Sequence, residues 1–126
     1  MSNANPYIIA KEKNNIIFIE MGGNINSETL PESRELVNEI IKKHEIYKRN
    51  NLKILVDYSN VIDVDSATIA NILDRLAEHK QHHHTIAFVN VPDEFLHLIQ
   101  LHKLEDKVTV YPSLKEAVKV LRKPTQ

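Results

Sequence analysis

The sequence predicts a single α/β domain with a mixed, mostly parallel sheet and the element order ββαβαβαβα. Short apolar runs with the length of strands alternate with longer segments in which apolar residues recur every three or four positions. The connecting segments are only a few residues long, and this alternation favours right-handed crossovers between parallel strands. A chain of 126 residues suits one domain. We expect that domain to span residues 7–122, between a disordered N-terminus at residues 1–6 and a tail at residues 123–126.

A β-hairpin is predicted at the start of the domain. Two apolar runs, Tyr7–Ala10 and Ile16–Ile19, have the length of short strands, and Asn14–Asn15 between them suits a turn. Gly22–Gly23 follows the second run, and we expect this pair to end the hairpin.

A helix and a central strand are predicted next. Over residues 28–47 apolar side chains recur at helical spacing, Pro31 suits the first turn, and Asn50–Asn51 closes the segment. Ile54–Val56 is a continuous apolar run, which is typical of a strand covered on both faces of a sheet. The face of the helix that should meet the core consists of Leu36, Val37, Ile40, Ile41 and His44.

The second half of the chain alternates helices with strands. After an acidic loop, an amphipathic helix is predicted over about residues 66–80, followed by a strand at Thr85–Val89. Pro92–Asp93 opens another helix, and Val108–Tyr111 is the last strand. The final helix begins at Ser113–Glu116, which has the pattern of a capping box.

Composition excludes several classes of function. Sixteen basic side chains against 17 acidic ones leave a formal net charge of −1, so there is no positive field to attract nucleic acid or an anionic membrane. There is no cysteine for disulfides or thiolate metal sites, and two adjacent glycines, Gly22 and Gly23, cannot form a phosphate-binding loop. No apolar run reaches the roughly 20 residues that span a bilayer. We therefore expect a cytoplasmic protein without a cofactor. The sequence contains no nucleophile paired with a general base, so we do not expect an enzyme.

Histidines and aspartates are the two groups that invite a metal or catalytic interpretation. Three consecutive histidines, His82–His84, point in different directions on a regular backbone, so they suit a solvated helix end better than a metal site. Asp57, Asp63 and Asp65 follow the central strand, where they could chelate Mg²⁺ or accept a phosphoryl group. The alternative is that these aspartates only cap turns, and no companion base or lysine supports catalysis.

Ser66 is placed where a buried strand and an acidic loop lead into a helix. One interpretation is a helix N-cap, a role in which serine is strongly favoured. The other is a phosphorylation site, because the unpaired backbone N–H groups of a helix N-terminus can hold a phosphate.

The segment Val56–Thr68 resembles the signature of STAS domains, the family of anti-sigma factor antagonists. In that signature a hydrophobic strand with an aspartate leads to an Asp-Ser pair at the start of a helix, and Asp65–Ser66 matches that pair. The resemblance covers about residues 7–121 and implies a single STAS-like domain. It continues through Gly23–Asn26, Ala87–Val91, Leu98–Leu104 and Tyr111–Ala117.

The resemblance implies a regulatory function. In the anti-sigma antagonist branch, the serine that Ser66 matches is phosphorylated by a partner that is both a serine kinase and an anti-sigma factor. The unmodified protein would bind that partner and free a sigma factor, and a phosphate of about −1.5 to −2 charges would break the contact. The residues implied at this contact are Asn26, Asp63, Asp65, Ser66, Ala67 and Thr68.

Departures from the family pattern leave a second function open. Ala67 and Thr68 stand where the family has Ser/Thr-Gly, and Asn26 lacks the charge that the family carries there. Asp63 adds a carboxylate near Ser66 that opposes a phosphate. These differences favour a STAS module that binds a protein or small ligand constitutively, without a phosphorylation switch.

Overall fold

The computed structural model describes residues 5–103 and 108–122. Residues 1–4 of the predicted disordered segment, and the whole predicted tail at residues 123–126, lie outside the described residues. The elements are β1 (Tyr7–Lys13), β2 (Ile16–Ile25), α1 (Leu30–Lys43), the 3₁₀ turn η1 (Ile46–Lys48), β3 (Lys53–Val64), α2 (Ser66–Gln81), β4 (Thr85–Val89), α3 (Asp93–Leu101), β5 (Thr109–Tyr111) and α4 (Leu114–Leu121).

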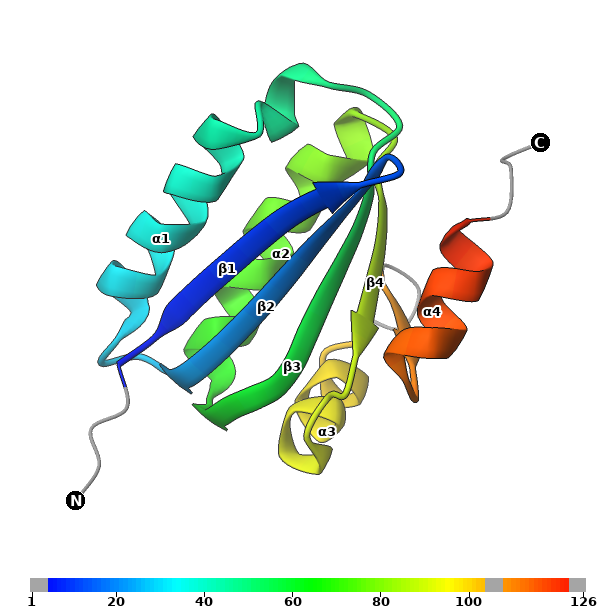
Figure 1. Ribbon diagram of the computed structural model, residues 1–126. Helices are drawn as coiled ribbons and strands as arrows, with labels where there is room; N and C mark the ends of the chain where they lie inside the picture. Colours follow the sequence, from blue (N-terminus) through cyan, green and yellow to red (C-terminus); the bar gives the residue numbers. More distant parts are fainter. Residues whose placement is uncertain (1–4, 104–107, 123–126) are drawn as a thin grey trace.

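One five-stranded sheet organises the fold, with the strands in the order β1-β2-β3-β4-β5. β1 pairs with β2 in the antiparallel sense, and every other neighbouring pair is parallel. The predicted element order and the mostly parallel sheet are therefore confirmed (Figure 1).

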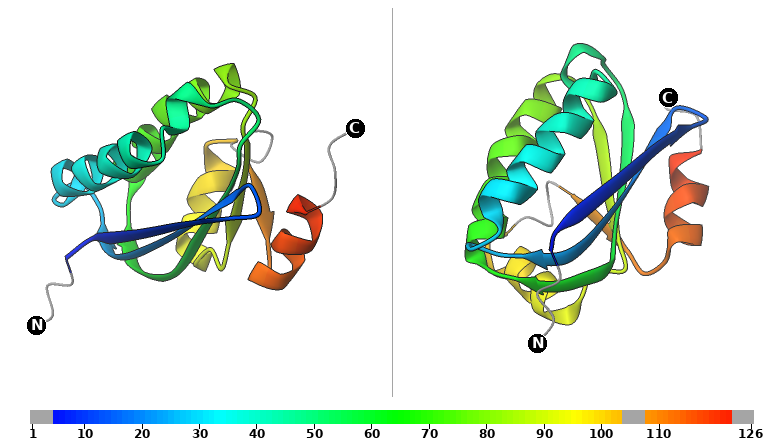
Figure 2. Two further views of the ribbon diagram at one scale, coloured as in Figure 1. Left: turned by 45° about the horizontal axis from the view of Figure 1, so that its top comes forward. Right: turned by 60° about the vertical axis from the view of Figure 1, so that its left-hand side comes forward.

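Helices cover both faces of the sheet. α1 and α2 lie side by side over one face and α4 lies over the other, as the right-hand view of Figure 2 shows. The central strand β3 divides its apolar side chains between the two layers. Ile54 and Val56 join the larger buried cluster on the α1/α2 side, whereas Leu55 joins the smaller cluster with Ala117 and Leu121 of α4. This alternation explains the continuous apolar run, because each face of the strand needs its own apolar residues.

β2 and β3 are longer than the sequence predicts. Gly22 and Gly23 do not end the hairpin but lie inside β2, and the expected acidic loop is instead the end of β3, which runs to Val64. Strand pairing explains the difference, since Gly23 lies opposite Val61 and Ile25 lies opposite Val64 across two irregularities in the register. Pairing gives the polar residues of both strands backbone partners that local composition does not reveal.

Gly22 has a specific packing reason to be glycine. It lies opposite Tyr7 of β1, and a Cβ atom at this position would lie 2.3 Å from a carbon of the Tyr7 ring. The ring therefore occupies the space that a side chain would fill, and its hydroxyl donates a hydrogen bond to Glu20 Oε2 over 2.9 Å.

The first helix ends earlier than predicted. α1 stops at Lys43, and Glu45 has a φ of 52°, in the left-handed region where a right-handed helix cannot continue. The predicted segment then finishes as the separate turn η1, in which Ile46 is buried. None of the helices among the described residues combines the length and apolar character that a bilayer span requires.

Candidate functional site

Ser66 is the first residue of α2, at the edge of the sheet where the parallel strands end. Its side chain is exposed, and its hydroxyl has no hydrogen-bond partner among the described residues. The predicted position at a strand-to-helix junction is therefore confirmed, but the N-cap interpretation is wrong. Asp65 is the N-cap, with an extended backbone and a side chain that accepts hydrogen bonds from the helix.

The carboxylate of Asp65 joins α2 to the segment after β2. Its Oδ1 accepts from the backbone N–H groups of Ala67 at 3.0 Å and Thr68 at 3.3 Å, and its Oδ2 accepts from the N–H of Ser27 at 2.8 Å. Partial burial alone would raise the pKa of Asp65. The hydrogen bonds from Ser27, Thr68 and Ala67 outweigh burial, so the pKa lies below its usual value and the side chain is charged at neutral pH.

This cap changes the expected role of the helix N-terminus. The backbone N–H groups of Ala67 and Thr68, which were expected to be unpaired and able to hold a phosphate, already donate to Asp65. An anion at Ser66 would have to compete with a carboxylate of the same chain for these two donors. The site therefore presents Ser66 to solvent rather than enclosing it.

Asn26 and Asp63 are in direct contact beside this cap. Asn26 Nδ2 donates to Asp63 Oδ2 over 2.8 Å, and Asn26 Oδ1 accepts from the backbone N–H groups of Glu28 and Thr29. The amide thus links the end of β2 to β3 while it stabilises the turn that leads into α1. A carboxylate at position 26 would face Asp63 with like charge, so this pair explains why an uncharged Asn26 suits the extra Asp63.

Thr68 fixes the start of α2 from inside the fold. Its side chain is 4% exposed, and its Oγ1 donates to the backbone oxygen of Ile25 over 2.5 Å. Of the predicted partner-binding residues, Thr68 therefore offers the least surface, whereas Ala67 is half-buried next to the exposed Ser66. Contact of these residues with a partner stays a prediction.

The third aspartate, Asp57, lies inside β3, at a point where the pairing register with β2 shifts. Its Oδ1 accepts from the backbone N–H of Ser59 at 2.9 Å and from Asn90 Nδ2 at 3.1 Å, which joins β3 to the end of β4. Asp57 therefore accepts hydrogen bonds within the fold, but at an irregular point of a strand and not at the turn that the alternative expected. Among the described residues no group of three or more His, Asp or Glu side chains is placed to hold a metal ion.

The histidines at the far end of α2 contact one another. His79 Nδ1 lies 2.9 Å from His84 Nδ1, and His84 Nε2 lies 2.7 Å from the backbone oxygen of Arg49. The second contact requires Nε2 of His84 to carry the proton, so Nδ1 of His84 accepts from Nδ1 of His79. Burial lowers the pKa of His79 to about 4 and also lowers that of His84, so both rings are neutral at pH 7.

Three residues of this region were not predicted from the sequence. Ser27 interacts with Asp65 through its backbone N–H and its side chain, a contact between segments 38 positions apart that local sequence does not single out. Thr29 accepts from the N–H of Asn26 and donates to the backbone oxygen of Asn24, a role that its spacing from Asn26 could have signalled. Ile62, four positions before Ser66, is 63% exposed, and its exposure follows from strand alternation between buried Val61 and the half-buried Asp63.

Comparison with known proteins agrees with this architecture. A model of the STAS domain family matches residues 7–117. No curated protein matches the chain in sequence. Among solved structures, a putative anti-sigma factor antagonist from Thermotoga maritima has 19% sequence identity and a TM-score of 0.73, and the match covers 92% of this chain and 95% of that one.

Two further solved structures show the range of proteins with this fold. The anti-sigma factor antagonist SpoIIAA in its unphosphorylated form has 13% identity and a TM-score of 0.68, with 94% of this chain and 99% of that chain covered. The murine anion transporter Slc26a9 has 15% identity and a TM-score of 0.70, with 93% of this chain but only 22% of the transporter covered. At these identities the likeness concerns the fold.

Proposed function

Because the chain belongs to the STAS domain family, we propose that it is an anti-sigma factor antagonist-like regulatory protein, switched by phosphorylation at Ser66. Its partner is a protein that combines serine kinase and anti-sigma activity, and the encounter takes place in the cytoplasm. The observation that carries the proposal is the exposed, unbonded hydroxyl of Ser66 at the start of α2. The protein itself is a substrate and binding partner rather than an enzyme.

The surroundings of Ser66 are consistent with a surface that binds a partner protein. Asp65 and Thr68 hold the start of α2 against the end of β2, so the position of Ser66 is set by the fold rather than by its own contacts. Ile62 adds an exposed apolar side chain on the preceding strand. An exposed apolar side chain with polar neighbours is compatible with the apolar centre and polar rim of a protein interface.

A phosphate at Ser66 would act through charge. It would add about −1.5 to −2 charges close in sequence to the carboxylates of Asp65 and Asp63, and two helix donors that could neutralise it, the N–H groups of Ala67 and Thr68, are occupied. The modified surface would repel an acidic or apolar partner surface that accepts the unmodified serine. This is the physical basis of the proposed switch.

Phosphorylation is tested by incubating the protein with ATP and the anti-sigma-type serine kinase of its own organism, followed by intact-mass measurement. We expect a gain of one phosphate, about 80 Da, in the wild type and none in Ser66→Ala. Ser59→Ala is the matched control, because Ser59 is also exposed and lies on the preceding strand, so this variant should still gain the phosphate. Absence of phosphate on Ser66 would end the switch proposal.

The alternative is a STAS module that binds a protein or small ligand constitutively. The extra Asp63 and its contact with Asn26 favour it, because they place negative charge where a phosphate would be added. Partner affinity of Ser66→Asp and of the uncharged Ser66→Asn separates the two functions. The switch predicts at least a tenfold loss, about 1.4 kcal/mol, for Ser66→Asp alone, whereas the constitutive module predicts equal affinities.

A further inference from the structure

A cavity of about 110 Å³ lies between α1, α2 and the sheet, on the face opposite α4. Its floor is largely apolar, because the strands contribute aliphatic and aromatic side chains together with Met21. Engineered cavities of comparable size and lining hold small apolar molecules such as benzene. The floor and the apolar part of the walls include Ile19, Met21, Val37, Val56, Ile72 and Phe88.

Two side-chain contacts bridge α1 and α2 beside the cavity, and the α2 member of each contact, Asn71 or Arg75, lines it. Arg34 Nε of α1 donates to Asn71 Oδ1 of α2 over 3.2 Å, and Arg75 of α2 donates to Asn38 Oδ1 of α1 from both Nη atoms over 3.3 Å. Because these exposed side-chain bonds can open without moving backbone, a small molecule has a route between the helices.

Arg75 is the feature that gives this cavity a chemical preference. It lines the cavity, and its Nε is buried without a hydrogen-bond acceptor. The guanidinium donates to the uncharged amide oxygen of Asn38 and also interacts with the uncharged side chain of Tyr47, and no carboxylate among the described residues lies within ion-pairing distance of it. A guanidinium with a free buried donor calls for an acceptor, and a carboxylate is the acceptor that guanidinium geometry matches.

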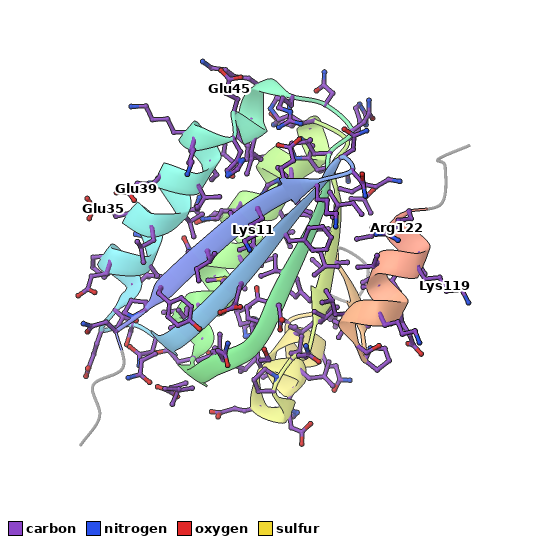
Figure 3. All side chains as sticks on the ribbon, viewed as in Figure 1. Lys11, Glu35, Glu39, Glu45, Lys119 and Arg122 are labelled. Carbon is purple, nitrogen blue, oxygen red and sulfur yellow. The ribbon has the colours of Figure 1, made fainter. Side chains whose placement is uncertain are left out.

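No acidic side chain lines the cavity to satisfy that donor. Glu35 and Glu39 of α1 point away from α2 into solvent, as Figure 3 shows. His79 also lines the cavity, but it is neutral at pH 7 and adds no second charge. The cavity therefore combines an apolar interior with one uncompensated positive charge.

We propose that this cavity binds a small apolar anion, a short-chain carboxylate whose hydrocarbon part fills the space between the helices and whose carboxylate is bound by Arg75. The site lies on the inner faces of α1 and α2 and does not use Ser66. Carboxylate binding in the cavity can therefore be tested independently of phosphorylation at Ser66.

The test is a titration of the ¹⁵N-labelled full-length protein with sodium hexanoate, followed by amide chemical shifts. 1-Hexanol and hexylammonium are matched probes with the same chain and a neutral or positive head. We expect saturable shifts on α1, α2 and the facing strands, with hexanoate bound at least tenfold more tightly than either matched probe. Equal affinities for the three probes, or no saturable shift with hexanoate, would overturn the proposal without the need for any variant.

Two variants locate the charge. Arg75→Gln should weaken hexanoate binding at least tenfold and leave hexanol binding within about twofold, since only the carboxylate loses its partner. Arg34→Gln is the control, because Arg34 bridges the same two helices without lining the cavity, and it should keep hexanoate affinity within about twofold. If both variants weaken hexanoate equally, the preference comes from the general surface charge and the assignment to Arg75 is wrong.

Discussion

Asp65 should be worth more than an ordinary helix cap, because its carboxylate connects two segments of the fold. Replacing it with alanine removes two acceptor contacts to the first turn of α2 and the 2.8 Å contact to the N–H of Ser27. Loss of an N-cap typically costs about 1 kcal/mol. The charge-assisted bond to Ser27 is partly solvated, so we take a value below the usual range of about 1.5 to 3 kcal/mol and add about 1 kcal/mol. We therefore expect Asp65→Ala to lower the free energy of unfolding by about 2 kcal/mol.

Asp65→Asn separates the two contributions. Asparagine is as good an N-cap as aspartate, so its side-chain oxygen can still accept from Ala67 and Thr68. Its NH₂ group would then face the N–H of Ser27, and two donors cannot form a hydrogen bond. Only the contact between residue 65 and Ser27 is therefore lost. We expect a cost of about 1 kcal/mol, between the wild type and the alanine variant.

Urea unfolding at pH 7, followed by far-ultraviolet circular dichroism, measures these differences. Ser113→Ala is the matched control, because Ser113 caps α4 through one contact of 3.3 Å to the N–H of Glu116 and has no cross-link. We expect it to cost about 1 kcal/mol or less. If Asp65→Ala costs no more than Ser113→Ala, or if Asp65→Asn equals the wild type, the carboxylate does not join the two segments and the reasoning fails.

Three other perturbations test the packing around the site and the far end of α2. Thr68→Val should cost about 1 to 3 kcal/mol in urea unfolding, because it leaves the backbone oxygen of Ile25 buried without its donor, whereas Thr68→Ser should cost clearly less. Burial holds the pKa of His79 at about 4 against 6.5 for the free side chain, so the unfolded state binds more protons between these values. Stability should therefore fall as the pH is lowered from about 6.5 to 4, by about 3 kcal/mol in total from this group, and most of that slope should be absent from His79→Gln. Gly22→Ala should displace the Tyr7 ring and cost about 1 kcal/mol, a penalty that a second substitution, Tyr7→Ala, should largely remove.

The fold class could be predicted because periodicity is a local property. Runs such as Ile54–Val56 and the helical spacing of α1 carry their own signal, and the short connections leave few ways to pair the strands. The ends of β2 and β3 could not be predicted in the same way. Asn24 and Asp63 are poor strand formers by composition, and they lie in strands because each strand gives the other backbone partners.

The position of the site could be predicted from the sequence. Which of its two adjacent polar residues caps the helix could not. Asp65 and Ser66 are adjacent, and both residue types are favoured as N-caps. The choice between them is made by the N–H of Ser27, which lies 38 positions earlier in the sequence and donates to the aspartate. A serine at the cap position would leave that donor without a charged acceptor, so a tertiary contact moves the cap back by one residue.

The occupied cap bears directly on how a phosphate at Ser66 would work. A phosphoserine that could draw hydrogen bonds from the first turn of α2 would be held against the helix, and part of its charge would be neutralised there. In this fold Asp65 already takes the N–H groups of Ala67 and Thr68, and the same carboxylate is held from its other side by Ser27. Displacing it would cost the helix its cap and the fold a cross-link. A phosphate could not draw on these two donors, so it would stay mostly in solvent, and it would change what the surface can bind without having to change the fold.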